Sequence, residues 1–251
     1  MSHPVRISNT LLLGDGIPKI CIPVTGRTVE EISAQSCLAA ECPPDLIEWR
    51  ADHFREIYSL AARESALAAL AEASGPVPLL FTFRSESEGG EAAISAEGYC
   101  RFCLWAADRP EIAAVDVEGL RPDCDTKALI RDIRLAGTIV IASRHFFSGT
   151  PSSSEMEAVL NDLAETGADI VKMAVMPACA EDVIRLMSAT EKMHRLLPQP
   201  LITMAMGKEG AVSRVSGTLT GSALTFGTAG AASAPGQLPA AELRRILDLL
   251  Q

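Results

Sequence analysis

The chain has 251 residues, enough for one large domain with a sizeable core. Hydrophobic residues make up 48% and charged residues 22%, which excludes a disordered chain, and the apolar runs are shorter than the roughly 18 residues of a transmembrane helix. With 22 basic and 32 acidic residues the net charge is −10, so neither a nucleic acid nor a membrane is an expected partner, and an anionic ligand needs a local cationic site.

The seven cysteines follow no disulfide rhythm, and the N-terminus lacks the pattern of a secretory signal. Reduced thiols in a cytoplasmic protein are the simplest explanation. Cys100 and Cys103 have the spacing of a redox or zinc pair, but no second pair or histidine cluster accompanies them. We therefore expect both to be small, buried hydrophobic side chains on a helix.

Eight short apolar runs recur along the chain and are predicted to be strands. Most carry β-branched or large apolar residues at successive positions, which is typical of parallel strands buried on both faces. The predicted strands are 19–24, 45–50, 77–83, 112–117, 138–143, 169–173, 200–204 and 223–227.

Amphipathic helical patterns lie between these runs. One of them opens with Ser152-Ser-Ser-Glu155, which has the form of a capping box. The predicted helices are 29–42, 64–73, 97–107, 126–136, 152–165, 180–196 and 239–250, with a weaker and shorter pattern at 208–216.

This alternation of eight strands with about eight helices predicts a single (β/α)8 barrel over residues 1–251. A doubly wound open sheet is the alternative, but no glycine-rich phosphate loop follows the first strand. Residues 1–18 are predicted to form a β-hairpin that closes the bottom of the barrel, with its turn at Gly14-Asp-Gly16.

Chemistry in such a barrel is expected at the C-terminal ends of the strands. Polar residues end five adjacent predicted strands, several as i, i+2 pairs that point to the same side. Charges on an inward face are costly unless they are paired or functional. These residues are Glu48 and Arg50, Thr82 and Arg84, Asp116 and Glu118, Ser143 and His145, and Lys172.

Lys172 ends a buried strand, so it is either an ion-pair partner or a nucleophilic amine. Burial disfavours the ammonium form, and a neutral amine can attack a ketone. Its position beside a strand that ends in His145 favours the nucleophile, because a neutral imidazole can move the protons of such a reaction. His145 could instead be an ordinary loop histidine, and Asp116 and Glu118 could orient Lys172 or pair with an arginine. No ligand-spacing motif supports a metal.

The remaining polar groups suit a substrate that bears hydroxyls and a carboxylate, or else form a salt-bridge network along the rim. Arg214 is a candidate carboxylate clamp. The small-residue segment 227–237, which includes Ser233 and Gln237, is predicted to close over a ligand; the alternative is a simple surface connection.

Several ordered blocks of the sequence resemble the type I 3-dehydroquinate dehydratases. The likeness runs from about Leu11 to the C-terminus. It implies a (β/α)8 barrel, usually a homodimer, that eliminates water from 3-dehydroquinate through a lysine Schiff base without a cofactor or metal. The blocks are Glu48-Trp-Arg-x-Asp-His-Phe54, Phe81-Thr-Phe-Arg84 with Glu88-Gly-Gly-Glu91, Asp169-Ile-Val-Lys172 and Ala231-Ala-Ser-Ala-Pro-Gly-Gln237.

The resemblance also implies residue roles. Two departures stand out: Phe146 follows the histidine where the family commonly has Asp, and Pro23 replaces a serine at the end of the first strand. The implied catalytic residues are the Schiff-base Lys172, the general acid/base His145 and its neighbour Glu88; those binding the ring hydroxyls are Glu48, Arg50 and Arg84; those holding the carboxylate are Arg214, Ser233 and Gln237; and the apolar walls are Met204, Met206 and Phe226.

Two other functions fit part of the pattern. A class I aldolase would share Lys172 but would have little use for Arg84, Arg214, Ser233 and Gln237. A non-catalytic barrel that binds an anion of the shikimate pathway is favoured by Phe146 and disfavoured by the retained lysine and histidine. A product assay separates the three.

Overall fold

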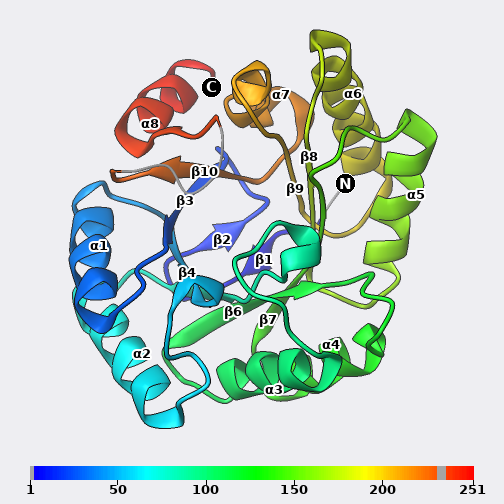
Figure 1. Ribbon diagram of the computed structural model, residues 1–251. Coiled ribbons are helices and arrows are strands. Elements are labelled where there is room, and N and C mark those ends of the chain that lie inside the picture. The colour runs from blue at the N-terminus through cyan, green and yellow to red at the C-terminus, as the bar shows by residue number, and fades with distance from the viewer. Residues whose placement is uncertain (1–2, 231–235) are drawn as a thin grey trace.

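The protein forms a (β/α)8 barrel, as predicted (Figure 1). The computed structural model describes residues 3–230 and 236–251. Consecutive strands pair in parallel, and β10 pairs with β3. Between β9 and β10 the ring is closed by a bridge from Leu201 to Ser222 and by a 2.7 Å hydrogen bond from Ala223 N to Leu201 O. The strands are β3 (Lys19–Val24), β4 (Leu46–Arg50), β5 (Leu79–Thr82), β6 (Ile112–Glu118), β7 (Ile139–Phe146), β8 (Ile170–Val175), β9 (Leu201–Ala205) and β10 (Leu224–Thr228), with the short β11 (Leu238–Pro239) beside β10.

The helices surround the strands as an outer ring (Figure 1). Helix α5 begins where the capping box predicts: Ser152 Oγ accepts from Glu155 N, and the Glu155 carboxylate accepts from Ser152 N. The helices are α1 (Val29–Glu41), α2 (Leu60–Ser74), α3 (Ala96–Ala107), α4 (Thr126–Leu135), α5 (Ser153–Ala164), α6 (Ala180–Leu196), α7 (Gly217–Thr220) and α8 (Ala240–Leu249), with 3-10 turns η1 (Ala51–His53), η2 (Glu86–Glu88) and η3 (Glu209–Arg214).

Alternation along the strands produces two apolar layers. Outward side chains such as Trp49 and Phe81 pack under the helices, while inward side chains such as Leu46 and Leu80 fill the barrel. Further along the same inward rows the side chains become polar. The C-terminal mouth of the barrel is therefore where charged groups converge.

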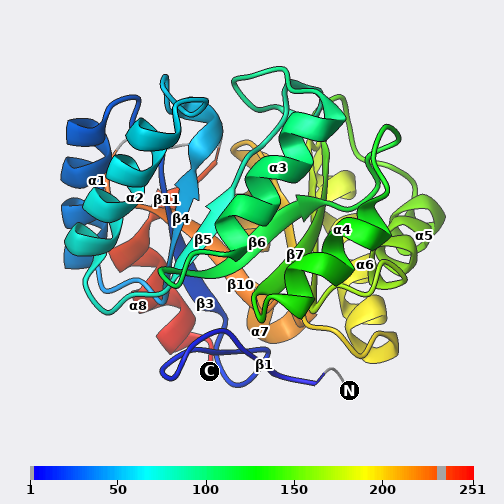
Figure 2. The same cartoon turned by 90° about the horizontal axis from the view of Figure 1, so that it is seen from below.

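Two local predictions were wrong. The hairpin exists, with β1 (Val5–Arg6) antiparallel to β2 (Leu12–Leu13), but its turn lies at residues 7–11, where Ser8 Oγ accepts from the Leu11 amide. Gly14 and Gly16, at φ 88° and 68°, instead link β2 to β3. Figure 2 shows β1 at the end of the barrel opposite the long loops.

The weak helical pattern at 208–216 is also different. The chain forms the 3-10 turn η3 and then the one-turn helix α7, because Gly210 and Gly217 make close backbone approaches there. A Cβ on Gly210 would lie 2.2 Å from the Ala205 carbonyl oxygen, and one on Gly217 would lie 2.5 Å from that of Ser222.

The cysteines carry free thiols, and Cys103 is fully buried in α3 as expected for a small hydrophobic residue. Cys100 lies on the same helix but, contrary to the prediction, is only half-buried, and its Sγ lies 2.9 Å from that of Cys124 in the segment before α4. Among the helices of the described residues, none has the length and apolar character needed to cross a membrane.

Candidate active site

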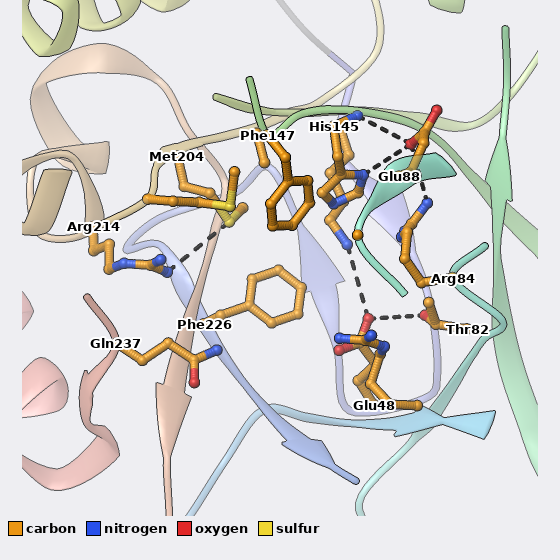
Figure 3. Close-up of a pocket in the computed structure, with 15 residues that line it drawn as sticks. Glu48, Thr82, Arg84, Glu88, His145, Phe147, Met204, Arg214, Phe226 and Gln237 are labelled. Atoms are coloured by element: carbon orange, nitrogen blue, oxygen red, sulfur yellow. Dashed lines mark hydrogen bonds and ion pairs between the residues drawn. The ribbon is translucent and has the colours of Figure 1, made fainter. Parts of the chain in front are cut away.

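A cavity of about 220 Å³ opens at the C-terminal mouth of the barrel (Figure 3). It brings together every predicted site residue except Ser233, which lies outside the described residues. The predicted residues that line it are Glu48, Arg50, Arg84, Glu88, His145, Lys172, Met204, Met206, Arg214, Phe226 and Gln237; Thr82, Gly89, Phe147 and Ala174 complete the lining.

Lys172 projects into this cavity from the middle of β8 and is only 3% exposed. Its Nζ donates a 3.0 Å hydrogen bond to Asp116 Oδ2 and lies 3.8 Å from Glu48 Oε1. On another side it lies 4.6 Å from the ring centroid of Phe226. The prediction of an ion-pair partner is therefore confirmed, and the amine also borders the cavity, where a nucleophile would have to lie.

Asp116 anchors the lysine from β6, which is separated from β8 by β7. Its Oδ1 accepts hydrogen bonds from Arg84 Nη2 at 2.7 Å and from Ser143 Oγ at 2.6 Å. Burial by itself would raise the pKa of this carboxyl group, but Arg84 and Lys172 lower the pKa to about 2. The group is a permanent anion near neutral pH and holds both cations in place.

Arg84 is the centre of the charge network. Besides Asp116, it contacts Glu88 and Glu118 at 3.4 Å each. Burial opposes its charge, yet these carboxylates raise its pKa above the ordinary value. Glu118 is also bound by Arg121 at 3.1 Å from outside the cavity. Arg84 therefore serves as a structural hub as well as a cavity residue.

His145 is the penultimate residue of β7, and its side chain is 11% exposed. Burial first, and then the charges of Arg84 and Lys172, hold the pKa of His145 well below its usual range, so the imidazole is neutral at pH 7. Its Nδ1 lies 3.1 Å from Glu88 Oε2, which also accepts from the His145 backbone amide at 3.0 Å (Figure 3). Burial raises the pKa of Glu88 to about 7.

The protonation state of Glu88 selects the tautomer of the imidazole. An ionised carboxylate can only accept hydrogen bonds, so Nδ1 must then carry the ring proton. That leaves the lone pair of Nε2 as a proton acceptor. His145 is thus equipped to act as a base while Glu88 is ionised.

Arg50 and Glu48 are oriented by Asp52 and Thr82, to which the family resemblance assigned no role. Asp52 holds Arg50 through two hydrogen bonds of 2.9 and 2.8 Å, and it also accepts from the Arg84 backbone amide. Thr82 Oγ1 donates to Glu48 Oε1 at 2.8 Å. Thr82 lies two residues before Arg84 on the same inward row. This spacing is the reason why the sequence analysis counted Thr82 among the polar residues at the strand ends.

The opposite wall is apolar apart from Arg214 and Gln237 (Figure 3). Met204 and Phe226 contribute to this wall, and Arg214 Nη1 lies 4.0 Å from Met204 Sδ. Burial alone lowers the pKa of Arg214 to about 10, because it strips the guanidinium of water. In Figure 3 Arg214 and Gln237 lie on one side of the cavity, across from His145 and Glu88.

Among the described residues that line the cavity, Phe147 is the large side chain that residue patterns missed. It stacks at 6.5 Å on the His145 ring, and a Cβ on Gly89 would lie 2.2 Å from the Phe147 ring. Glycine is therefore required where η2 passes this ring. Within the described residues, no group of three or more potential ligand side chains is arranged to hold a metal ion.

A buried lysine and a neutral histidine at the C-terminal mouth of a (β/α)8 barrel are the groups that a lysine-dependent barrel enzyme requires. Comparison with known proteins identifies the particular family. Residues 20–251 match the model of type I 3-dehydroquinase, and the chain belongs to this family.

Individual relatives agree with this assignment. The chain is 41% identical over 251 residues to the 3-dehydroquinate dehydratase of Klebsiella pneumoniae, covering 100% of both chains, and 40% identical over 244 residues to that of Listeria monocytogenes, covering 97% of both. It superimposes with a TM-score of 0.94, at 36% identity, on a crystal structure of type I 3-dehydroquinate dehydratase from Clostridium difficile, covering 100% of this chain and 98% of the other. That structure contains covalently modified comenic acid.

Proposed function

We propose that this protein is a 3-dehydroquinate dehydratase, a hydro-lyase that removes water from 3-dehydroquinate to form 3-dehydroshikimate. Family membership supports the reaction. The observation that carries the mechanism is the buried amine of Lys172, which borders the same cavity as the neutral imidazole of His145.

The first half of the reaction builds an electron sink. Lys172 loses one proton, and the neutral His145 is a base in the same cavity that can receive it. The amine then adds to the ketone carbon of the substrate, and the carbonyl oxygen becomes the hydroxyl group of a carbinolamine. His145 gives the proton that it received to this hydroxyl group, which leaves as water, so that an iminium ion forms and the imidazole is neutral again. The positive nitrogen acidifies the adjacent C–H bond, because it can take up the electron pair that the departing proton leaves behind.

The second half eliminates the hydroxyl group. Nε2 of His145 takes the carbon-bound proton, which leaves an enamine. The enamine electrons expel the hydroxyl group of the neighbouring carbon, and His145 returns a proton so that it leaves as water. A second water molecule hydrolyses the iminium, releasing the product and restoring the amine of Lys172. The balance is the loss of one water per turnover.

The charged rim holds the substrate for these steps. Arg214 and Gln237 line one side of the cavity and suit the substrate carboxylate, and Ser233 is assigned to the same group by the family resemblance. Glu48, Arg50 and Arg84 line the rest of the rim and suit the ring hydroxyls. Met204, Met206 and Phe226 supply apolar contact. This fixation aims one C–H bond at the imidazole, which converts binding energy into orientation.

The covalent step can be tested by intact-mass spectrometry after borohydride reduction, with and without 3-dehydroquinate. We expect a substrate-dependent mass increase in the wild type and none in Lys172→Met, which should also lose turnover. His145→Ala should accumulate the adduct and release it slowly. Normal turnover by Lys172→Met, or a folded wild type that shows neither adduct nor product, contradicts the proposal.

We also infer a cytoplasmic homodimer that acts in the shikimate pathway, toward chorismate and the aromatic amino acids. Free thiols support the compartment, and the family resemblance supports the dimer and the pathway. Quinate degradation uses the same step. Sedimentation equilibrium measures the oligomeric state, and growth of an aromatic auxotroph that carries this gene tests the biosynthetic role.

A further inference from the structure

Arg144 contacts the acid–base pair from outside the cavity. It lies between Ser143 and His145 on β7, so its side chain leaves the strand on the opposite face. The side chain is 34% exposed, and the guanidinium carbon lies 5.5 Å from the ring centroid of Phe146. Its Nη1 donates a 2.9 Å hydrogen bond to Glu88 Oε1. Arg144 thus reaches the carboxylate without lining the cavity.

The two oxygens of Glu88 have different partners. Oε2 accepts from the backbone amide of His145 and lies 3.1 Å from Nδ1 of the same residue. Oε1 is held by Arg144. A carboxylate clamped at one oxygen by a guanidinium and at the other by a backbone amide cannot rotate without breaking both bonds. The orientation that serves the imidazole is therefore maintained from two sides.

The charge balance around Glu88 also depends on Arg144. Arg84 faces Glu88 at 3.4 Å but lies closer to Asp116, at 2.7 Å. Glu118 is another carboxylate near Glu88, and both it and Asp116 favour protonation of Glu88. The closest cation to Glu88 in the described part of the chain is Arg144, at 2.9 Å.

We propose that Arg144 is a positioning residue for the dehydration: it keeps Glu88 ionised and turned so that His145 carries its proton on Nδ1 and presents a free Nε2 to the substrate. This inference rests on the proposed function. Without Arg144, a protonated Glu88 donates its own O–H to Nδ1, and the proton of the neutral imidazole moves to Nε2. In that tautomer His145 cannot accept a proton from the substrate.

The kinetic test compares the pH dependence of kcat in Arg144→Met, Arg144→Gln and Arg144→Lys. Loss of the charge should move the acidic limb upward by about one pH unit, so kcat at pH 7 falls about fivefold and recovers above about pH 9. KM should stay within about twofold, because Arg144 does not line the cavity. Arg144→Lys should restore most of the profile. Arg131→Met on α4, which removes a 66% exposed arginine, is the control for net charge.

A second readout does not require turnover. The chain has four histidines, so two-dimensional ¹H–¹⁵N NMR can resolve their ring nitrogens, with His145→Gln to assign the signal. At pH 8 we expect mainly the Nδ1–H tautomer in the wild type and about equal amounts of the two tautomers in Arg144→Met, in which the Nε2–H form should predominate at pH 7. A wild-type profile and tautomer in folded Arg144→Met or Arg144→Gln overturn the proposal. An inactive wild type with the expected tautomers would instead refute the dehydratase function alone.

Discussion

Replacement of Asp116 by Asn is predicted to destabilise this protein more than loss of Lys172 itself. Asp116 binds Arg84 through one oxygen and Lys172 through the other, and all three side chains are at most 4% exposed. Asp116→Asn leaves two buried cations without the anion between them. Lys172→Met removes one cation, but Asp116 keeps Arg84 and the hydroxyl of Ser143.

The magnitudes follow from these contacts. Removal of one partner from a buried ion pair costs about 3–5 kcal/mol, because the remaining charge stays desolvated. We therefore expect Asp116→Asn to lower the free energy of unfolding by about 4 kcal/mol. Lys172→Met should lower it by about 1 kcal/mol, since it deletes one hydrogen bond together with the charge that required it.

Urea unfolding at pH 7, followed by far-UV circular dichroism, measures both free energies. Asp123→Asn is the matched control: Asp123 is 49% exposed and pairs with Arg121, so its loss should cost less than about 1 kcal/mol. The double variant with Lys172→Met should be more stable than Asp116→Asn alone. The reasoning is refuted if Asp116→Asn costs no more than Lys172→Met.

Two further variants probe other groups of the site. The pKa of Glu88 is about 7 in the folded protein, against an ordinary value of 4.5. Between pH 4.5 and pH 7 the folded state therefore binds a proton at Glu88 that the unfolded state has lost. The stabilisation from this protonated carboxyl group is fully present below pH 4.5. As the pH rises to 7 it is lost, and the free energy of unfolding falls by up to about 3 kcal/mol. Urea midpoints at pH 5 and pH 8 should show this loss in the wild type but less of it in Glu88→Gln; equal losses would contradict the assignment. Arg214→Gln should raise KM for 3-dehydroquinate about 100-fold with a smaller change in kcat, because a charge-assisted contact to the carboxylate is removed; an unchanged KM in steady-state assays would disprove this role.

The barrel could be predicted because its signal is local and repeated. A buried parallel strand must be apolar at successive positions, so each of the eight strands is visible in its own few residues. The predictions failed where the outcome depended on distant contacts. The extension of β7 to Phe146, beyond the predicted end at residue 143, is such a case: it pairs with β8 as far as Val175.

The site was predictable as a set of strand ends, since polar residues such as Glu48 and Lys172 interrupt rows that are otherwise apolar. The sequence did not predict which of these charged side chains contact one another. Sequence reasoning left open whether Asp116 orients the lysine or pairs with an arginine, and the structure shows both contacts. Arg144 gave no signal at all, because it lies on the outward face of β7 and its partner Glu88 belongs to η2, a segment far away in the sequence.

The amino-acid sequence by itself thus determined the fold class, the end of the barrel that carries the site and the chemical types gathered there. Periodicity and residue type are properties of short segments, and the likeness to a family adds to them. Only the tertiary structure decided which carboxylate neutralises which cation, and therefore which groups titrate near pH 7. Distances between charges on different strands set those preferences, and burial amplifies them, because the interior screens charge far less than water does.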